Sequence, residues 1–214
     1  MITGNVRNYK MINEILYIII AGLLLGGLYG LIAMGLSIQY GVARVLNVGH
    51  GEFIMLGAMS TYSLYTFAGI NPFLAILICA PISFIIGFFL HTTVFRRLLN
   101  TSPNAGVFES NSMLASFGIL FVIQNIAAVA WQADIRAYSF MNTPVNILGD
   151  DYGANRLVVL GVAIAMGLAF YFFLTYTRLG KAIRAAAQDA TTASLMGVNI
   201  NLVLAICFGI GAAL

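Results

Sequence analysis

Charged residues are scarce in this sequence. Asp, Glu, Lys and Arg together make up 8% of its 214 residues, whereas hydrophobic residues make up 61%. A soluble domain typically has roughly 25% charged residues. The shortage of charge excludes a soluble globular domain and indicates an integral membrane protein. The apolar residues come in runs of the length that a membrane-crossing α-helix needs, and they do not alternate as in the strands of a β-barrel.

Cysteine is also scarce, and both cysteines lie inside apolar runs. Neither Cys79 nor Cys207 belongs to a Cys-x-x-Cys or Cys/His pattern. A thiol in such a run packs as a small hydrophobe, so we expect no disulfide, no metal site and no cofactor. We also expect no cleavable signal peptide, because the polar N-terminal tail leads into an apolar run that is too long for the apolar region of one.

The apolar runs predict the fold class: an all-α integral membrane protein, a polytopic transmembrane helix bundle of about six spans with the last incomplete. The last run ends at Leu214, before reaching the roughly 17 to 25 residues of a crossing, so we expect the chain to be the N-terminal part of a longer protein. The predicted spans are Ile15–Tyr40, Phe53–Ala68, Phe73–Phe95, Met113–Trp131, Leu157–Tyr176 and one that begins near Leu202.

The Lys and Arg residues in alternate loops predict the orientation in the membrane. The loops 41–52, 96–112 and 177–201 hold six of the ten cations, and the N-terminal tail and the loop 132–156 hold the other four. We therefore expect the first three loops to be cytoplasmic. The cations flank apolar runs without interleaved aromatic residues, which excludes a nucleic-acid-binding surface.

A polar segment between the first two apolar runs is the strongest candidate for a functional site. It reads Leu-Asn-Val-Gly-His-Gly-Glu and contains Asn47, His50 and Glu52. Placing an ionisable side chain at a membrane edge or inside the membrane costs about 3 kcal/mol of free energy unless the side chain faces water, protein or a substrate path. The flanking glycines, Gly49 and Gly51, allow the chain to turn or to approach a neighbouring helix. We therefore expect a translocation pathway or gate at Asn47, His50 and Glu52.

A purely structural role is the alternative for the same segment. Asn47 would cap the next helix, and Glu52 in its first turn would interact favourably with the helix dipole. His50 is not explained by capping. The second histidine, His91, lies near Arg96 and Arg97, and we expect it to be an interfacial side chain.

Glycine spacing in the first span predicts close helix packing. Gly22, Gly26 and Gly30 follow one another at intervals of four, the small-xxx-small pattern of tightly packed membrane helices. Gly27 and Gly35 lie in the same span.

Residues 178–190 predict a short amphipathic helix between two spans. The segment is rich in alanine, a strong helix former, and its charged side chains share one face. One interpretation is a basic helix resting on anionic lipid. The small uncharged strip of Ala182, Ala186 and Ala190 favours a protein partner instead, because membrane-surface helices carry larger apolar residues.

Enzymatic functions lack their motifs. The two histidines, His50 and His91, do not form a His-Glu-x-x-His site, and no Gly-x-x-x-x-Gly-Lys-[Ser/Thr] is present to bind ATP. A channel or secondary transporter for a small solute such as urea or a short amide remains an alternative, because glycine-broken helices with buried ionisable groups suit those machines too.

Four blocks of this sequence resemble the permeases of ABC importers for branched-chain amino acids, the LivH/LivM type, and they occur in the same order as in that family. The blocks are Gly-Leu-Ser-Ile-Gln-Tyr-Gly-Val from Gly35, Leu-Asn-Val-Gly-His-Gly-Glu-Phe-Ile-Met-Leu-Gly-Ala from Leu46, Arg-Leu-Gly-Lys-Ala-Ile-Arg-Ala from Arg178 and Ala-Ser-Leu-Met-Gly-Val-Asn from Ala193.

The resemblance implies one transmembrane permease domain over residues 1–214, in the bacterial inner membrane and without an enzymatic activity of its own. It implies a second permease subunit, cytoplasmic ATPase subunits that hydrolyse ATP, and an extracytoplasmic solute-binding protein as partners. Membrane lipid surrounds it. The family also implies that the segment 178–190 is a cytoplasmic coupling helix on the ATPase. The residues that would couple are Arg178, Gly180, Lys181, Arg184, Ala185, Ala186 and Gly197.

Overall fold

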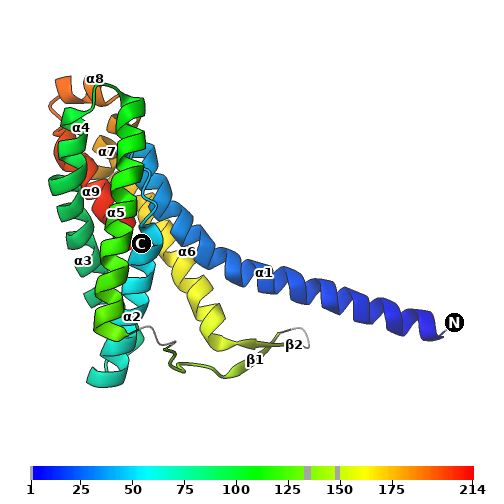
Figure 1. The fold of residues 1–214 in the computed structure, drawn as a ribbon. Helices are drawn as coiled ribbons and strands as arrows, with labels where there is room; N and C mark the ends of the chain where they lie inside the picture. Colours follow the sequence, from blue (N-terminus) through cyan, green and yellow to red (C-terminus); the bar gives the residue numbers. More distant parts are fainter. Residues whose placement is uncertain (1, 133–135, 148–149) are drawn as a thin grey trace. The chain divides into compact units, whose positions relative to one another are not determined.

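The computed structural model describes residues 2–132, 136–147 and 150–214, with side chains from Glu14 onward, and most of them are helical (Figure 1). The predicted fold class, an all-α polytopic membrane protein, is confirmed. The elements are α1 (Ile2–Ala43), α2 (His50–Ala68), α3 (Pro72–Leu90), the π-helical turn η1 (His91–Phe95), α4 (Arg96–Thr101), α5 (Ala105–Trp131), β1 (Pro144–Ile147), β2 (Asp150–Gly153), α6 (Ala154–Tyr176), α7 (Arg178–Gln188), α8 (Ala190–Leu195) and α9 (Ile200–Ala213).

Four of the helical segments are long and apolar enough to cross a membrane. They are Glu14–Ala43, Pro72–Thr101, Ala105–Trp131 and Ala154–Tyr176. The predicted second span forms helix α2, whose serine, threonine and tyrosine residues make it less apolar than these four. The last predicted span forms α9, which has 14 residues. The structure therefore confirms the helices at the predicted spans but not the number of crossings.

Side-chain caps fix where several helices begin. An Asn or Thr side chain accepts a hydrogen bond from a backbone N–H of the first helical turn, which would otherwise lack a partner. The caps Asn71, Asn104, Thr177 and Asn199 accept from the backbone N–H groups of Phe73, Val107, Gly180 and Leu202.

The chain divides into two compact units, and unit 1 consists of residues up to Ala33 together with Ser139–Tyr171. Within it, Gly27 of α1 lies against α6: a Cβ on this glycine would come within 2.7 Å of the Leu160 side chain. The Tyr17 and Tyr152 rings stack with centroids 5.5 Å apart. Strands β1 and β2 pair antiparallel, which the sequence did not predict for the loop 132–156.

The Gly-x-x-x-Gly prediction is not met inside unit 1, where no atom of the described residues lies within 4 Å of a Cβ placed on Gly22, Gly26 or Gly30. Close packing does occur at Gly27 and at Gly35, which lie on other faces of the helix. The spacing pattern identified a helix with small residues but not the face that packs.

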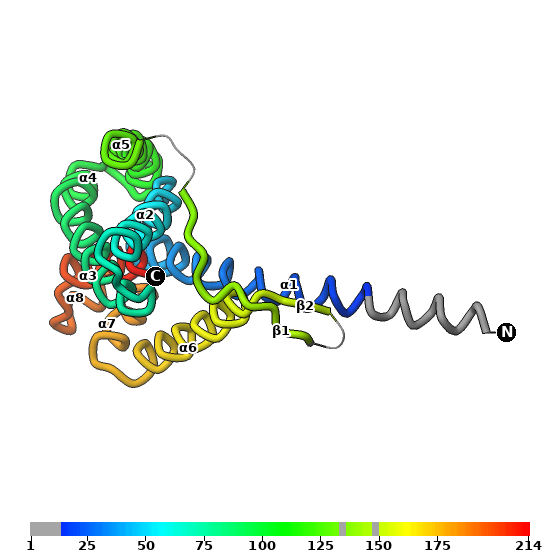
Figure 2. Tube along the Cα trace, turned by 90° about the horizontal axis from the view of Figure 1, so that it is seen from below, coloured from blue at the N-terminus to red at the C-terminus, as the bar shows by residue number. Residues whose placement is uncertain are grey.

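Unit 2 consists of Met34–Tyr138 and Phe172–Leu214, and α9 is its most buried helix. Figures 1 and 2 show α9 next to α3, and α9 also packs against η1, α2, α7 and α8. Its buried residues are Val203, Leu204, Ala205, Cys207, Phe208, Gly209, Gly211 and Ala212. In Figure 1, α4 and α8 lie at the end of this unit opposite to the Trp131 end of α5.

Glycines allow the backbones of α3 and α9 to come together. A Cβ on Gly87 would lie 2.7 Å from the Ala212 Cβ and 3.2 Å from the Phe208 carbonyl oxygen. A Cβ on Gly209 would lie 3.0 Å from the Phe84 ring and carbonyl oxygen. Membrane helices associate largely through such van der Waals packing, because lipid gives no hydrophobic drive for helices to pair.

A second close approach joins α9 to α1. A Cβ on Gly211 would lie 2.6 Å from the Gly35 carbonyl oxygen and 2.5 Å from the Gln39 Cγ. A Cβ on Gly35 would lie 2.9 Å from the Gly211 carbonyl oxygen. Neither glycine can gain a side chain without a shift of backbone.

His91 lies buried in the core of unit 2, whereas the sequence predicted an interfacial side chain. Its side chain is 1% exposed. The ring packs near those of Phe95 and Phe208, at centroid distances of 6.4 and 6.0 Å, and the two phenylalanine rings lie 4.9 Å apart. The π-helical turn that begins at His91 changes the direction in which these side chains leave the helix.

Gly35→Ala is expected to lower the free energy of unfolding by about 1 to 3 kcal/mol, the range of overpacked cores. Gly41→Ala is the matched control, because Gly41 lies on the same helix with no atom within 4 Å of its Cβ position. Unfolding of the purified protein in mixed micelles measures both. Equal stabilities of the two variants would show that α1 and α9 are not in contact here.

Candidate functional site

A buried amide pair links the end of α1 to α9. Gln39 is 0% exposed. Its Nε2 donates to the Phe208 carbonyl oxygen at 3.2 Å, and its Oε1 accepts from the Asn47 Nδ2 at 3.2 Å. Buried polar groups cost free energy unless they are hydrogen-bonded, so this pair holds the α1–α2 connection at a defined distance from α9.

Ser116 of α5 holds the other side of the same connection. Its hydroxyl accepts from the Val48 N–H at 3.1 Å and lies within donating distance of the carbonyl oxygens of Leu46 (3.2 Å) and Met113 (2.7 Å). Gly49 passes close to this helix, since a Cβ there would lie 3.3 Å from the Ser116 carbonyl oxygen.

His50 begins α2 and is 4% exposed. The N–H of His50 donates to the Asn47 carbonyl oxygen at 3.3 Å. Its ring lies over Gly35 of α1, with Cε1 3.0 Å from the position of a Cβ on that glycine. The structure therefore brings Asn47 and His50 together at the contact of α1, α2 and α9.

Glu52 is not part of this cluster. It is the third residue of α2 and half-buried, where its charge interacts favourably with the helix N-terminus. Within the described part of the chain, its carboxylate makes no hydrogen bond or ion pair.

The capping alternative is wrong for Asn47. The N-cap of α2 is Gly49, without a side-chain hydrogen bond, and the Asn47 amide bonds to Gln39 instead. Sequence reasoning missed Gln39 and Ser116. The signal for them was a polar side chain inside an apolar run, which is costly to bury without a partner.

The second candidate site is α7, which is attached rigidly to the end of α6. The Thr177 hydroxyl accepts from the Gly180 N–H at 2.9 Å and donates to the Phe173 carbonyl oxygen at 2.7 Å. Gly180 lies so close to the preceding helix that a Cβ would be 2.5 Å from the Leu174 Cα. Only glycine fits here, so the turn between α6 and α7 is fixed.

The two faces of α7 have different surroundings. Ile183 and Ala186 are buried, and α7 packs against α8 and α9. Of the strip expected to face a partner, Ala186 is covered by the chain itself, Ala182 is half-buried and Ala190 is exposed. The exposed face carries Arg178, Lys181, Arg184 and Ala185.

Asp189 ends α7 two residues before the predicted boundary. Its backbone is extended, and its carboxylate accepts from the N–H groups of Thr191 and Thr192 as the N-cap of α8. The Thr192 hydroxyl also bonds to it, and these hydrogen bonds hold the pKa of Asp189 below its usual value. Gly197, with φ of 87°, makes the left-handed turn that follows α8.

The chain is similar in sequence to a family model and to several known proteins. Residues 18–214 match the family model described as branched-chain amino acid transport system, permease component. The chain is 28% identical over 208 residues to the high-affinity branched-chain amino acid transport system permease protein LivH of Salmonella typhimurium, and 26% identical over 208 residues to LivH of Escherichia coli. It is 26% identical over 211 residues to BraD of Pseudomonas aeruginosa, which has the same description.

These alignments cover most of this chain but a smaller share of the relatives. They span 90%, 90% and 92% of this chain, and 65%, 65% and 66% of the three relatives. The chain thus spans just under two thirds of the length of the curated relatives that it matches. No solved structure matches it.

Ser116→Ala is expected to lower the free energy of unfolding by about 1 to 3 kcal/mol, because it leaves the Val48 N–H without its partner. Ser112→Ala is the matched control: Ser112 is equally buried on α5, but among the described residues its hydroxyl bonds only to the Glu109 carbonyl oxygen of its own helix. Unfolding in micelles and hydrogen exchange at Val48 measure the difference. Equal losses would contradict a special role for Ser116.

Proposed function

The chain belongs to the family of permease components of branched-chain amino acid transport systems, and from this premise we propose that it is a membrane-spanning subunit of an ABC importer for branched-chain amino acids or related small polar solutes. It is a multi-pass protein of the bacterial inner membrane. In this proposal the chain does no covalent chemistry. Cytoplasmic ATPase subunits supply the energy, and a solute-binding protein delivers the solute to this chain and a second permease subunit.

The observation that carries the proposal, beyond family membership, is the fixed basic helix α7. The cap at Thr177 and the close contact at Gly180 fix its start, and Ile183 and Ala186 anchor it against the chain. Arg178, Lys181 and Arg184 stay exposed. A helix that is rigid on one side and cationic on the other suits docking to an acidic rim on a partner, with charge complementarity giving specificity.

A continuous set of contacts leads from α7 to the polar cluster. α7 packs against α9, and α9 holds Gln39 through the Phe208 carbonyl oxygen. Gly211 of α9 also lies against Gly35, over which His50 packs. A displacement of α7 by the ATPase subunits would therefore move α9 and, with it, the support of Asn47 and His50. Packed helices with two arrangements transmit such a change over long distances.

The site residues take different roles in this proposal. Asn47 and His50 form the gate, and Glu52 lines the pathway beside it. Arg178, Lys181, Arg184 and Ala185 contact the ATPase subunit. Gly180, Ala186 and Gly197 set the position of α7 and the turn after α8.

A channel or secondary transporter is the less favoured alternative, because such machines have no need of α7 as a docking element. It would share the buried polar cluster but carry solute without ATP. If α7 instead lies on the membrane surface, Arg178, Lys181 and Arg184 contact the headgroups of anionic lipids.

Lys181→Glu combined with Arg184→Glu is expected to release the ATPase subunits, or to uncouple ATP hydrolysis from uptake, and to lower uptake at least tenfold. The cause is repulsion from an acidic docking surface. Arg156→Glu is the matched control, because it reverses an exposed arginine at the predicted opposite face of the membrane. Co-purification and uptake in proteoliposomes measure both. Normal uptake with retained ATPase subunits would assign α7 to the lipid surface.

His50→Gln and Glu52→Gln are each expected to lower uptake at least tenfold while the complex still assembles, because both side chains act on the pathway. Glu109→Gln, which neutralises another half-buried carboxylate, should leave uptake within about twofold. The initial uptake rates of the three variants are compared with that of the wild-type complex. Size-exclusion chromatography checks that each complex is assembled. Loss of assembly in the His50 or Glu52 variant would make that residue structural.

A further inference from the structure

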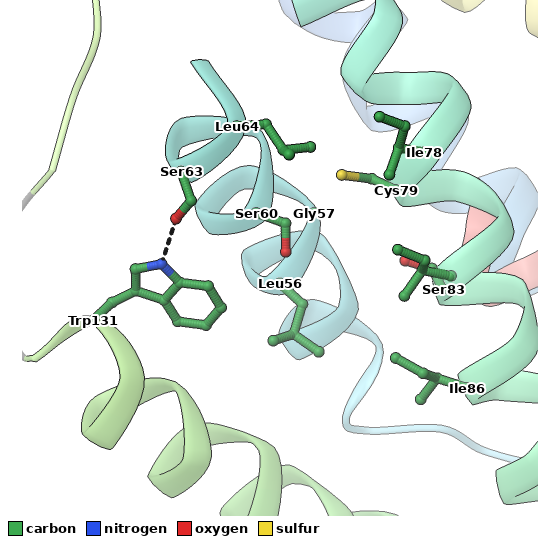
Figure 3. Close-up of a pocket in the computed structure, with 11 residues that line it drawn as sticks. Leu56, Gly57, Ser60, Ser63, Leu64, Ile78, Cys79, Ser83, Ile86 and Trp131 are labelled. Carbon is green, nitrogen blue, oxygen red and sulfur yellow. Dashed lines mark hydrogen bonds between the residues drawn. The ribbon is translucent and has the colours of Figure 1, made fainter. Parts of the chain in front are cut away.

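A cavity of about 300 Å³ opens between α2 and α3, with Trp131 of α5 beside it. Figure 3 shows Leu56, Ser60 and Leu64 of α2 facing Ile78, Cys79 and Ile86 of α3. All of these residues belong to unit 2. The cavity lies on the same helix, α2, that begins with His50.

Most of the cavity wall is apolar, but two hydroxyl groups in it have no hydrogen-bond partner among the described residues. Ser60 of α2 and Ser83 of α3 make no side-chain hydrogen bond to any residue that the structure describes. Ser63, in contrast, donates to the Met59 carbonyl oxygen at 3.0 Å and accepts from the Trp131 Nε1 at 2.7 Å. A hydroxyl that faces a cavity without a partner is available to a bound molecule.

The cavity is open along α3, where the wall residues Ile78, Ile82 and Ile86 are 37 to 51% exposed. Gly57 leaves the α2 side open, with no atom within 4 Å of its Cβ position. The hydrogen bond to Ser63 holds the Trp131 indole in place at the other side. The volume lies at the lower end of ligand pockets, which span about 300 to 1,000 Å³.

We infer that this cavity binds the branched aliphatic side chain of the solute, with Ser60 and Ser83 offering hydrogen bonds to its polar end. The inference rests on the proposed function and adds a specificity site to it. The lining includes no charged residue, so the cavity selects by shape and apolar contact. A lipid acyl chain is the other candidate occupant, but it would leave both hydroxyls without a partner.

Gly57→Val tests the inference, because the added side chain fills the cavity from α2. In the complete importer, with the same solute-binding protein throughout, leucine uptake should fall at least fivefold relative to alanine uptake. Gly118→Val is the matched control: Gly118 also has no atom within 4 Å of its Cβ position, and it does not line the cavity. An unchanged leucine-to-alanine ratio in Gly57→Val would overturn the inference.

Cys79 provides a second measurement that needs no variant. Figure 3 shows its sulfur directed towards α2, whereas Cys207, the other cysteine, is fully buried in α9. Leucine at millimolar concentration should slow modification of Cys79 by a small thiol reagent at least threefold, and glycine should not. Mass spectrometry locates the modified residue.

The outcomes separate this inference from the proposed function. If wild-type importer takes up leucine and leucine leaves the Cys79 rate unchanged, the cavity is not a solute site and the function stands. A rate that rises only on removal of lipid identifies an acyl chain as the occupant and also overturns the inference. If the wild-type importer takes up neither a branched-chain amino acid nor a related small polar solute, the proposed function itself fails.

Discussion

The close approach of α9 to α1 and α3 is the constraint on which unit 2 depends. Gly35 faces Gly211, and Gly87 faces Gly209 and Ala212, at distances that leave no room for a side chain. Lipid is as apolar as the helices, so the helices gain stability by packing closely and not by leaving water. The glycines therefore determine which helices become neighbours, and α9 takes the position at which they meet.

The polar contacts of the candidate gate follow from that packing. Gln39 reaches the Phe208 carbonyl oxygen only because its helix touches α9, and Asn47 then bonds to Gln39. Ser116 completes the support from α5. α7 packs on the same central helix. Helix α9 thus contacts both α7 and the Gln39–Asn47 pair. In the proposed importer, α9 links ATP hydrolysis to the gate.

The sequence predicts local features well and the choice of packing face poorly. Apolar runs placed the helices, and the cationic face of residues 178–188 was readable from its period. The break at Asp189 was missed, although an Asp before Ala-Thr-Thr is a helix N-cap signal. The spacing of Gly22, Gly26 and Gly30 indicated a packed face, yet Gly35 makes the contact, because only the tertiary structure determines which glycine meets a partner. Gln39 and Ser116 were missed for the same reason: a polar residue in an apolar run can be identified, but its partner on a distant helix cannot.

The most direct test of the central claim is the energy dependence of leucine transport by the assembled importer in proteoliposomes. The account predicts that labelled leucine accumulates inside the vesicles against its gradient only when ATP is present on the side of the ATPase subunits and the solute-binding protein is on the other. Equilibration of leucine across the membrane at the same rate without ATP would contradict it and would identify a channel.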